Sequence, residues 1–131
     1  MTAPGLRYRE FEVLSMAPAR RFVLLFTHLL VQLRLARGHA ERGEIERRTQ
    51  RLTRAQEIVV ELLASLDRDT GGDLAQKLAG LYGWLVGEFA SLHARPDLAR
   101  FDLVIRVISE LHEAWSAAAD LVTRPGADPL V

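Results

Sequence analysis

At 131 residues, with 49% hydrophobic and 26% charged positions, the chain has the size and composition of one globular domain able to bury a core. Seventeen basic residues balance seventeen acidic ones, so the net charge would not hold a polyanion, and nucleic acid is not an expected partner. The absence of cysteine excludes disulfides and thiolate chemistry and fits a reducing, cytoplasmic compartment.

Neither membrane insertion nor a signal peptide is expected. The longest apolar run, residues 22–31, is far shorter than the roughly 20 residues of a membrane span. The first residues also lack a basic start followed by an apolar stretch.

The first predicted helix runs from Pro18 to Arg42, with proline in the opening turn, where its missing N–H costs nothing. Residues 22–31 are apolar around the circumference, interrupted only by Thr27 and His28. A helix that is apolar on every side is typical of a position surrounded by other helices. We therefore expect a central helix, with residues 22–31 its most buried stretch.

The second and third predicted helices each carry one apolar stripe. Gly43 can end the first helix in a left-handed conformation, and Glu44 opens the second, which runs to about Leu66. After residues 67–72 the third helix runs from Asp73 to about His93. The stripes comprise Ile45, Leu52, Val59, Leu62, Leu63 and Leu66 on the second helix and Leu74, Leu78, Leu81, Leu85, Phe89 and Leu92 on the third.

A fourth helix follows Arg95-Pro96, with Asp97 as its predicted N-cap, and ends near residue 123. Its stripe comprises Phe101, Val104, Ile108, Leu111, Trp115 and Val122. Four helices of roughly 21 to 25 residues with short connections predict an all-α, antiparallel up-down four-helix bundle over residues 17–123. Residues 1–16 are expected to form an extended or short-helical N-terminal segment, and residues 124–131 a flexible tail.

No constellation of residues indicates catalysis, a metal or a cofactor. The four histidines lie on different helices or helix ends, and none has a Glu-x-x-His or His-x-x-x-His spacing. His112 is flanked by Glu110 and Glu113, but such close neighbours do not share a helix face. Gly71-Gly72 lacks the strand and the lysine of a phosphate loop. We therefore expect a protein that is not an enzyme and binds no cofactor.

Two further surfaces could bind a partner. On the fourth helix, a second stripe lies roughly 110° from the first, so one stripe can face the bundle and the other a groove, although two neighbouring helices could equally bury both. On the third helix, small residues form a strip beside Trp84 and Val86, which we interpret as close packing within the bundle, with helix binding as the alternative. The second stripe comprises Leu103, Val107, Ala114 and Leu121, and the small-residue strip Ala79, Gly83, Gly87 and Ala90.

Landmarks in every helix, in the right order, support a family resemblance. Residues 46–67, which read ERRTQRLTRAQEIVVELLASLD, resemble the second helix of the FliS family of flagellin chaperones. Further landmarks between residues 8 and 119 are Tyr8, Val13, Pro18, Leu24-Leu25-Phe26, Gly71-Gly72-Asp73-Leu74-Ala75, Leu81-Tyr82, Trp84-Leu85 and Glu113-Ala114-Trp115. The chain departs from the family's pattern at Ala17, at His28, and at Gly87-Glu88, where relatives often carry paired arginines.

The resemblance implies a cytoplasmic export chaperone. Such a protein binds the disordered C-terminal segment of flagellin, prevents premature polymerisation and helps to deliver subunits to the flagellar export gate. The resemblance also implies an N-terminal segment that covers part of the client-binding groove. The expected client-binding residues are Leu103, Val107, Ala114, Leu121, Ala79, Tyr82 and Val86, and the expected lid residues are Tyr8, Phe11 and Val13.

The alternative function is structural. In that case the broad apolar faces would be buried in a homo-oligomer of helical bundles. For the chaperone we expect a monomer or a weak homodimer.

Overall fold

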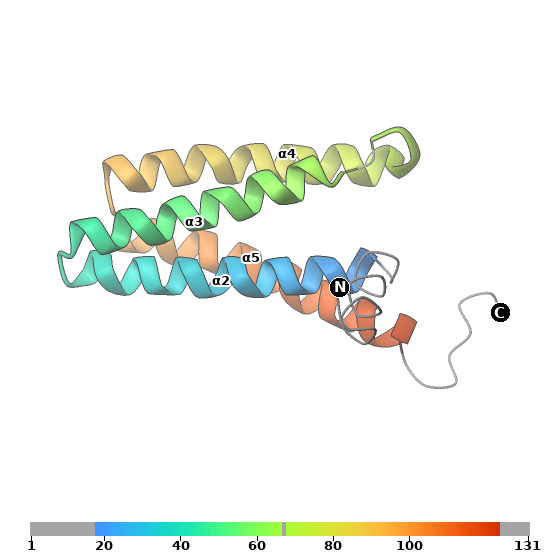
Figure 1. Cartoon of the computed structure of the whole chain (residues 1–131), viewed down its shortest axis with the longest axis horizontal. Helices are drawn as coiled ribbons and strands as arrows, with labels where there is room; N and C mark the ends of the chain where they lie inside the picture. The colour runs from blue at the N-terminus through green and yellow to red at the C-terminus, as the bar shows by residue number, and fades with distance from the viewer. Residues whose placement is uncertain (1–17, 67, 124–131) are drawn as a thin grey trace, which may run out of the picture.

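The computed structural model describes residues 18–66 and 68–123, which form four long helices. They are α2 (Pro18–Glu41), α3 (Ile45–Ala64), α4 (Arg68–Ala94) and α5 (Leu98–Thr123). Helix α2 packs against α3 and α5, and α4 packs against α3, whereas α4 and α5 meet over only a short stretch. Figure 1 shows α4 and α5 diverging from their connection. The predicted four-helix bundle is confirmed, with one edge largely open.

Polar contacts between helices show the antiparallel arrangement directly. Thr27 Oγ1 lies 2.8 Å from His112 Nε2, and further along α2 Arg37 Nε donates to Asp102 Oδ1 at 2.6 Å. Residue numbers therefore rise along α2 as they fall along α5. Near the start of α2, the rings of Phe22 and Trp115 pack with their centroids 5.2 Å apart.

The core is built largely from the stripes that the periodicity predicts, but Ile45 and Leu74, the first residues of two of these stripes, are 64% and 55% exposed. On α5 the buried residues belong to the Phe101 stripe, and on α4 to the stripe from Leu78 to Leu92. The largest fully buried side chains are Tyr82, Phe26, Phe89, Phe101, Leu29, Leu33, Leu52, Ile58, Leu62, Leu85, Leu92 and Ile108. All four helices contribute, which is expected when each presents one apolar arc to a common centre.

Helix α2 is less enclosed than its sequence suggests. Phe26, Leu29 and Leu30 are buried, but Leu24 and Val31 are about half exposed. The prediction that residues 22–31 form the most buried stretch is therefore wrong for one face of the helix. The reason is that only α3 and α5 pack against α2, so its outward side has no neighbouring helix among the described residues.

The connections follow the predicted turn chemistry. Gly43 has a φ of 70°, the left-handed conformation expected after the first helix. Asp97 caps α5, because its Oδ1 accepts a hydrogen bond from the backbone N–H of Ala99 at 3.0 Å. Helix α4 begins five residues before the predicted Asp73, but Gly72, with φ 54° and ψ −133°, breaks its regular geometry immediately before that residue.

The glycines of α4 lie on the outside of the bundle. Gly80, Gly83 and Gly87 are exposed, and a Cβ atom added at any of them would meet nothing within 4 Å. Close packing within the bundle, the preferred interpretation from the sequence, is therefore wrong. A glycine in a helix costs about 0.8–1 kcal/mol relative to alanine, and no tight contact among the described residues offsets that cost.

We predict that Gly87→Ala raises the free energy of unfolding by about 0.5–1 kcal/mol, because the helix gains propensity without a clash. Gly43→Ala should instead lower it by about 1–2 kcal/mol, because its φ of 70° is unfavourable for a residue with a Cβ. Urea unfolding followed by circular dichroism measures both changes. A destabilising Gly87→Ala would mean that this strip is packed against something.

Candidate functional site

The contact between α4 and α5 is fixed at one end by an ion pair. Arg100 donates from Nε and Nη2 to the two carboxylate oxygens of Glu88 at 2.7 and 2.6 Å. Glu88 is only 6% exposed, and its hydrogen bond to Arg100 raises the pKa of that guanidinium. A two-pronged charge-assisted bond of this kind fixes both distance and orientation, so it sets the register of the two helices.

Away from this pair the facing residues are apolar and progressively more exposed. Because antiparallel helices have the same rise per residue, the Glu88–Arg100 register places Leu81 level with Val107 and Leu74 level with Ala114. Leu81 and Val107 are half-buried, whereas Leu74 is 55% exposed and Ala114 is also exposed. We call Leu74, Leu81, Val107 and Ala114 the α4–α5 face.

The structure separates the two stripes of α5. Phe101, Val104 and Ile108 are core, whereas Leu103 and Val107 are half-buried and Ala114 is exposed, on the side of α5 from which Arg100 reaches α4. Three of the four candidate residues on this helix therefore lie on its Arg100 side. The side chain of the fourth, Leu121, is outside the described residues.

The candidates on α4 do not join them. Ala79, Val86 and His93 follow one another at intervals of seven residues, so they lie on the same side of α4. The backbone carbonyl of His93 accepts a hydrogen bond from Arg48 of α3 at 3.3 Å. Ala79 and Val86 therefore lie on the side of α4 that faces α3. Helical periodicity places Leu74 and Leu81 in the predicted core stripe of α4. Leu74, Leu81 and Glu88 are spaced seven residues apart, which indicates that they share one side of α4. Periodicity alone does not say which neighbouring helix that side faces.

Tyr82 belongs to the core. Its side chain is fully buried, and its hydroxyl has no hydrogen-bond partner within the described part of the chain. Burial raises the pKa of this phenol to about 12, so it remains protonated at any physiological pH.

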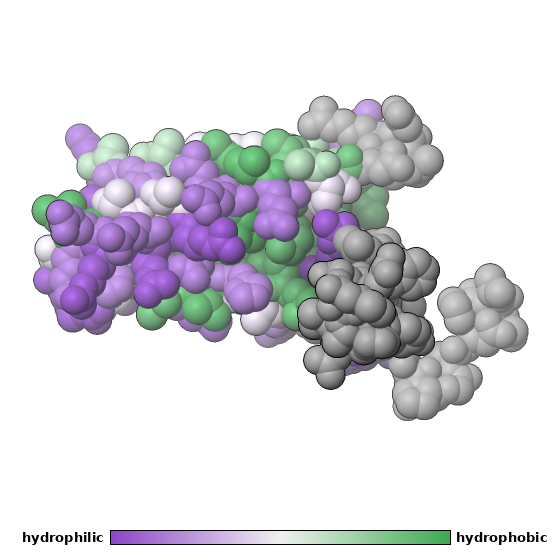
Figure 2. All heavy atoms as spheres, in the orientation of Figure 1, coloured by the Kyte–Doolittle hydropathy of each residue, from purple (hydrophilic) through white to green (hydrophobic). Residues whose placement is uncertain are grey.

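Apolar residues also gather where the bundle opens. Half-buried hydrophobic residues pack against the core near the start of α2, the end of α3 and the end of α5. Figure 2 shows a broad hydrophobic area over α3 and α4 at this end and a mostly hydrophilic surface at the other. The half-buried residues are Phe22, Leu25, Leu63, Leu66, Leu111 and Trp115. The predicted lid residues Tyr8, Phe11 and Val13 lie outside the described residues.

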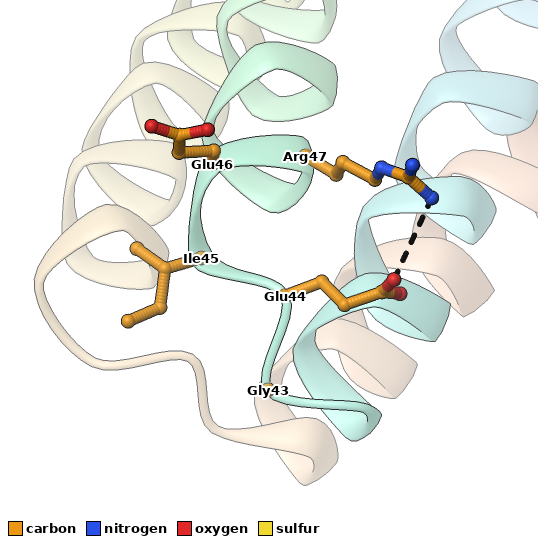
Figure 3. Close-up of a pocket in the computed structure, with 5 residues that line it drawn as sticks. All are labelled: Gly43, Glu44, Ile45, Glu46 and Arg47. Atoms are coloured by element: carbon orange, nitrogen blue, oxygen red, sulfur yellow. Dashed lines mark ion pairs between the residues drawn. The ribbon is translucent and has the colours of Figure 1, made fainter.

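A pocket of about 490 Å³ lies at the opposite end, at the turn between α2 and α3 (Figure 3). It is lined by Gly43, Glu44, Ile45, Glu46 and Arg47. The Glu44 carboxylate is already engaged, since it lies 3.0 Å from His39 Nδ1, accepts from Arg42 at 2.6 Å and pairs with Arg47 at 3.6 Å. The hydrogen bonds to His39, first, and to Arg42 lower the pKa of Glu44 to about 2. The one carboxylate of the pocket that forms ion pairs with described residues is therefore already engaged within the turn.

Within residues 18–66 and 68–123, no three histidine or acidic side chains are grouped so that they could hold a metal ion. No helix in the same ranges is long and apolar enough to cross a membrane.

Comparison with known proteins places the chain in a family. Residues 1–122 match the family described as flagellar protein FliS. The chain belongs to the FliS family. It is 32% identical over 97 residues to the flagellar secretion chaperone FliS of Vibrio cholerae, covering 67% of this chain and 71% of that protein. It is 29% identical to the Salmonella typhimurium FliS, covering 81% and 79%, and 24% identical to the Bacillus subtilis FliS, covering 88% and 85%.

One departure from the family pattern now has a structural account. Glu88 belongs to the Gly87-Glu88 pair, at which the chain departs from the family pattern. Here it holds α4 to α5 through Arg100. In this FliS-family chain, therefore, that position is used within the bundle.

We predict that Glu44 makes the free energy of unfolding of the bundle depend on pH in the acidic range. Its folded pKa of about 2 lies below the ordinary 4.5, so its stabilising contribution is complete above pH 4.5 and is lost as the pH falls towards 2. Urea unfolding of Glu44→Gln should show a smaller loss of stability between pH 5 and pH 2 than the parent protein. Asp102, whose pKa is lowered by Arg37, should leave some acid dependence in the variant.

Glu46→Gln is the matched control, because Glu46 is adjacent to Glu44 but forms no ion pair with the described residues. It should follow the parent protein. An unchanged acid dependence in Glu44→Gln would show that the turn cluster does not favour folding.

Proposed function

We propose that this FliS-family protein is a cytoplasmic flagellar export chaperone whose client is the disordered C-terminal segment of flagellin. The client binds on the α4–α5 face, is kept from premature polymerisation, and is passed to the flagellar export gate. The observation that carries this proposal is the apolar face that opens away from the Glu88–Arg100 pair.

The chemistry of this face suits a disordered client. A segment that folds on binding must offset an ordering cost of about 1–2 kcal/mol per residue, which demands a long apolar contact. The α4–α5 face supplies Leu74 and Leu81, two helical turns apart on α4, and Val107 and Ala114, two turns apart on α5. An amphipathic segment placed between two helices can bury its own apolar side there.

The face can bind without unfolding the protein. In the chain without a client, Phe101, Val104 and Ile108 of α5 and Leu85, Phe89 and Leu92 of α4 are already buried in the core. Leu81 and Val107 are half-buried at the margin of that core, so a client can reach them without displacing a buried residue.

Self-association through the same apolar surfaces is the alternative. Exposed apolar residues also mark interfaces between subunits, and Leu74 and Trp84 are both exposed. Light scattering with and without a flagellin C-terminal peptide separates the two, because a chaperone gives a complex of one chain with one client, and a structural oligomer keeps its mass.

We predict that Val107→Asp or Leu81→Asp weakens binding of a flagellin C-terminal peptide by at least about tenfold, because the new carboxylate must be desolvated on binding. Leu103→Asp should act in the same direction. Calorimetry measures the affinity, and circular dichroism confirms that each variant remains folded.

Val60→Asp is the matched control, since Val60 is 53% exposed on α3, away from the α4–α5 face. It should bind as the parent does. If Val107→Asp and Val60→Asp bind equally well, the client does not use the α4–α5 face.

We also predict that deleting residues 2–13 raises the affinity for the same peptide. A segment that competes with the client reduces its apparent affinity in proportion to the fraction of closed protein. Replacing Tyr8 and Val13 by serine should give a smaller change in the same direction. Lower or unchanged affinity in the deletion, measured by calorimetry, would reject the lid.

A further inference from the structure

The outward side of α2 carries a second apolar surface. Leu24, Val31 and Leu35 are 49%, 46% and 40% exposed. Their spacings of seven and four residues align them along one side of the helix. We call these three residues the α2 stripe. Figure 2 shows hydrophobic residues along the edge of the molecule where Figure 1 places α2.

The α2 stripe is separate from the α4–α5 face. Helix α2 packs against α3 and α5, and it makes no packing contact with α4. The stripe points away from the core, to which α2 contributes Phe26, Leu29 and Leu33 from its opposite side. One partner could therefore occupy the α2 stripe while a client occupies the α4–α5 face.

The charged residues of α2 before Glu41 are all arginines. Helix α2 has four arginines and no acidic residue before Glu41. Arg20, Arg21 and Arg34 form no ion pair with the described residues, and Arg51 of α3 donates only to the neutral Gln32, at 3.2 Å. Residues 18–64 carry nine arginines and five acidic residues, whereas residues 65–123 carry five basic and nine acidic ones. Although the net charge of the chain is zero, residues 18–64 are therefore basic and residues 65–123 are acidic.

We propose that the α2 stripe binds an amphipathic helix of another protein, with apolar residues flanked by aspartate and glutamate. Acidic flanks would pair with Arg20, Arg21 and Arg34, which form no ion pair among the described residues, while the apolar residues cover the stripe. A second copy of this chain fits less well, because two α2 helices face to face would bring their arginines together. An anionic membrane also fits less well, because three aliphatic residues without an aromatic make a narrow surface for insertion.

The test uses a synthetic amphipathic helix of about 18 residues, with leucines in one stripe flanked by glutamates, and a matched peptide with lysine in place of glutamate. Fluorescence anisotropy measures binding of each labelled peptide to the full chain. The glutamate peptide should bind at least about tenfold more tightly than the lysine peptide, and its affinity should fall with added salt.

Variants locate the site. Val31→Gln with Leu35→Gln, and separately Arg34→Glu, should each weaken binding of the glutamate peptide by about tenfold or more. Val60→Gln, an exposed apolar position on α3, should leave it unchanged. Equal binding of the two peptides, or equal binding to the parent and the α2 variants, would overturn the proposal.

Three further results would also overturn it. One is a concentration-dependent dimer, detected by light scattering, that Val31→Gln abolishes. Another is binding to phosphatidylserine vesicles that the same change abolishes. The third is competition between the glutamate peptide and a flagellin C-terminal peptide, since that would make the two surfaces one site. The proposal survives if flagellin binding fails, because the glutamate peptide probes α2 alone.

Discussion

The Glu88–Arg100 pair decides the shape of this bundle. It joins α4 to α5 at their connected end, and beyond it the two helices meet over only a short stretch. The other three edges are closed by apolar stripes that interlock along the helices. A bundle with three closed edges and one that opens has a stable core and, along the open edge, apolar residues without a complete set of neighbours. Leu74 and Leu81 are such residues, and the proposed client site depends on their position.

The fold was predictable from the sequence because helical periodicity and turn chemistry agree. Each stripe has the 3.6-residue period, and Gly43 and Asp97 supply the conformation and the cap that the turns require. The burial of α2 was not predictable in the same way. A helix that is apolar on all sides can be surrounded, or it can leave one side exposed, and the choice depends on how many helices reach it. Here two do, so Leu24 and Val31 remain exposed.

The candidate site was only partly predictable, for a related reason. The sequence distinguishes two stripes on α5 but does not say which one faces the core. In the structure, Leu103 and Val107 of the second stripe are half-buried at the edge of the core. On α4 the sequence favoured Ala79 and Val86, which face α3. Leu81 lies on the other side of α4, towards α5, and this position follows from the register that the Glu88–Arg100 contact sets. Periodicity gives the angle of a residue around its helix, but the identity of the neighbouring helix comes from tertiary contacts.

The central claim is that the client binds on the α4–α5 face. Hydrogen exchange followed by mass spectrometry, on the full chain with and without a flagellin C-terminal peptide, tests it most directly. Binding on this face slows exchange around residues 74–81 and 103–114, because the client restrains the ends of α4 and α5 that are least held together. Slowed exchange confined to residues 24–35 of α2, with α4 and α5 unchanged, would contradict the claim.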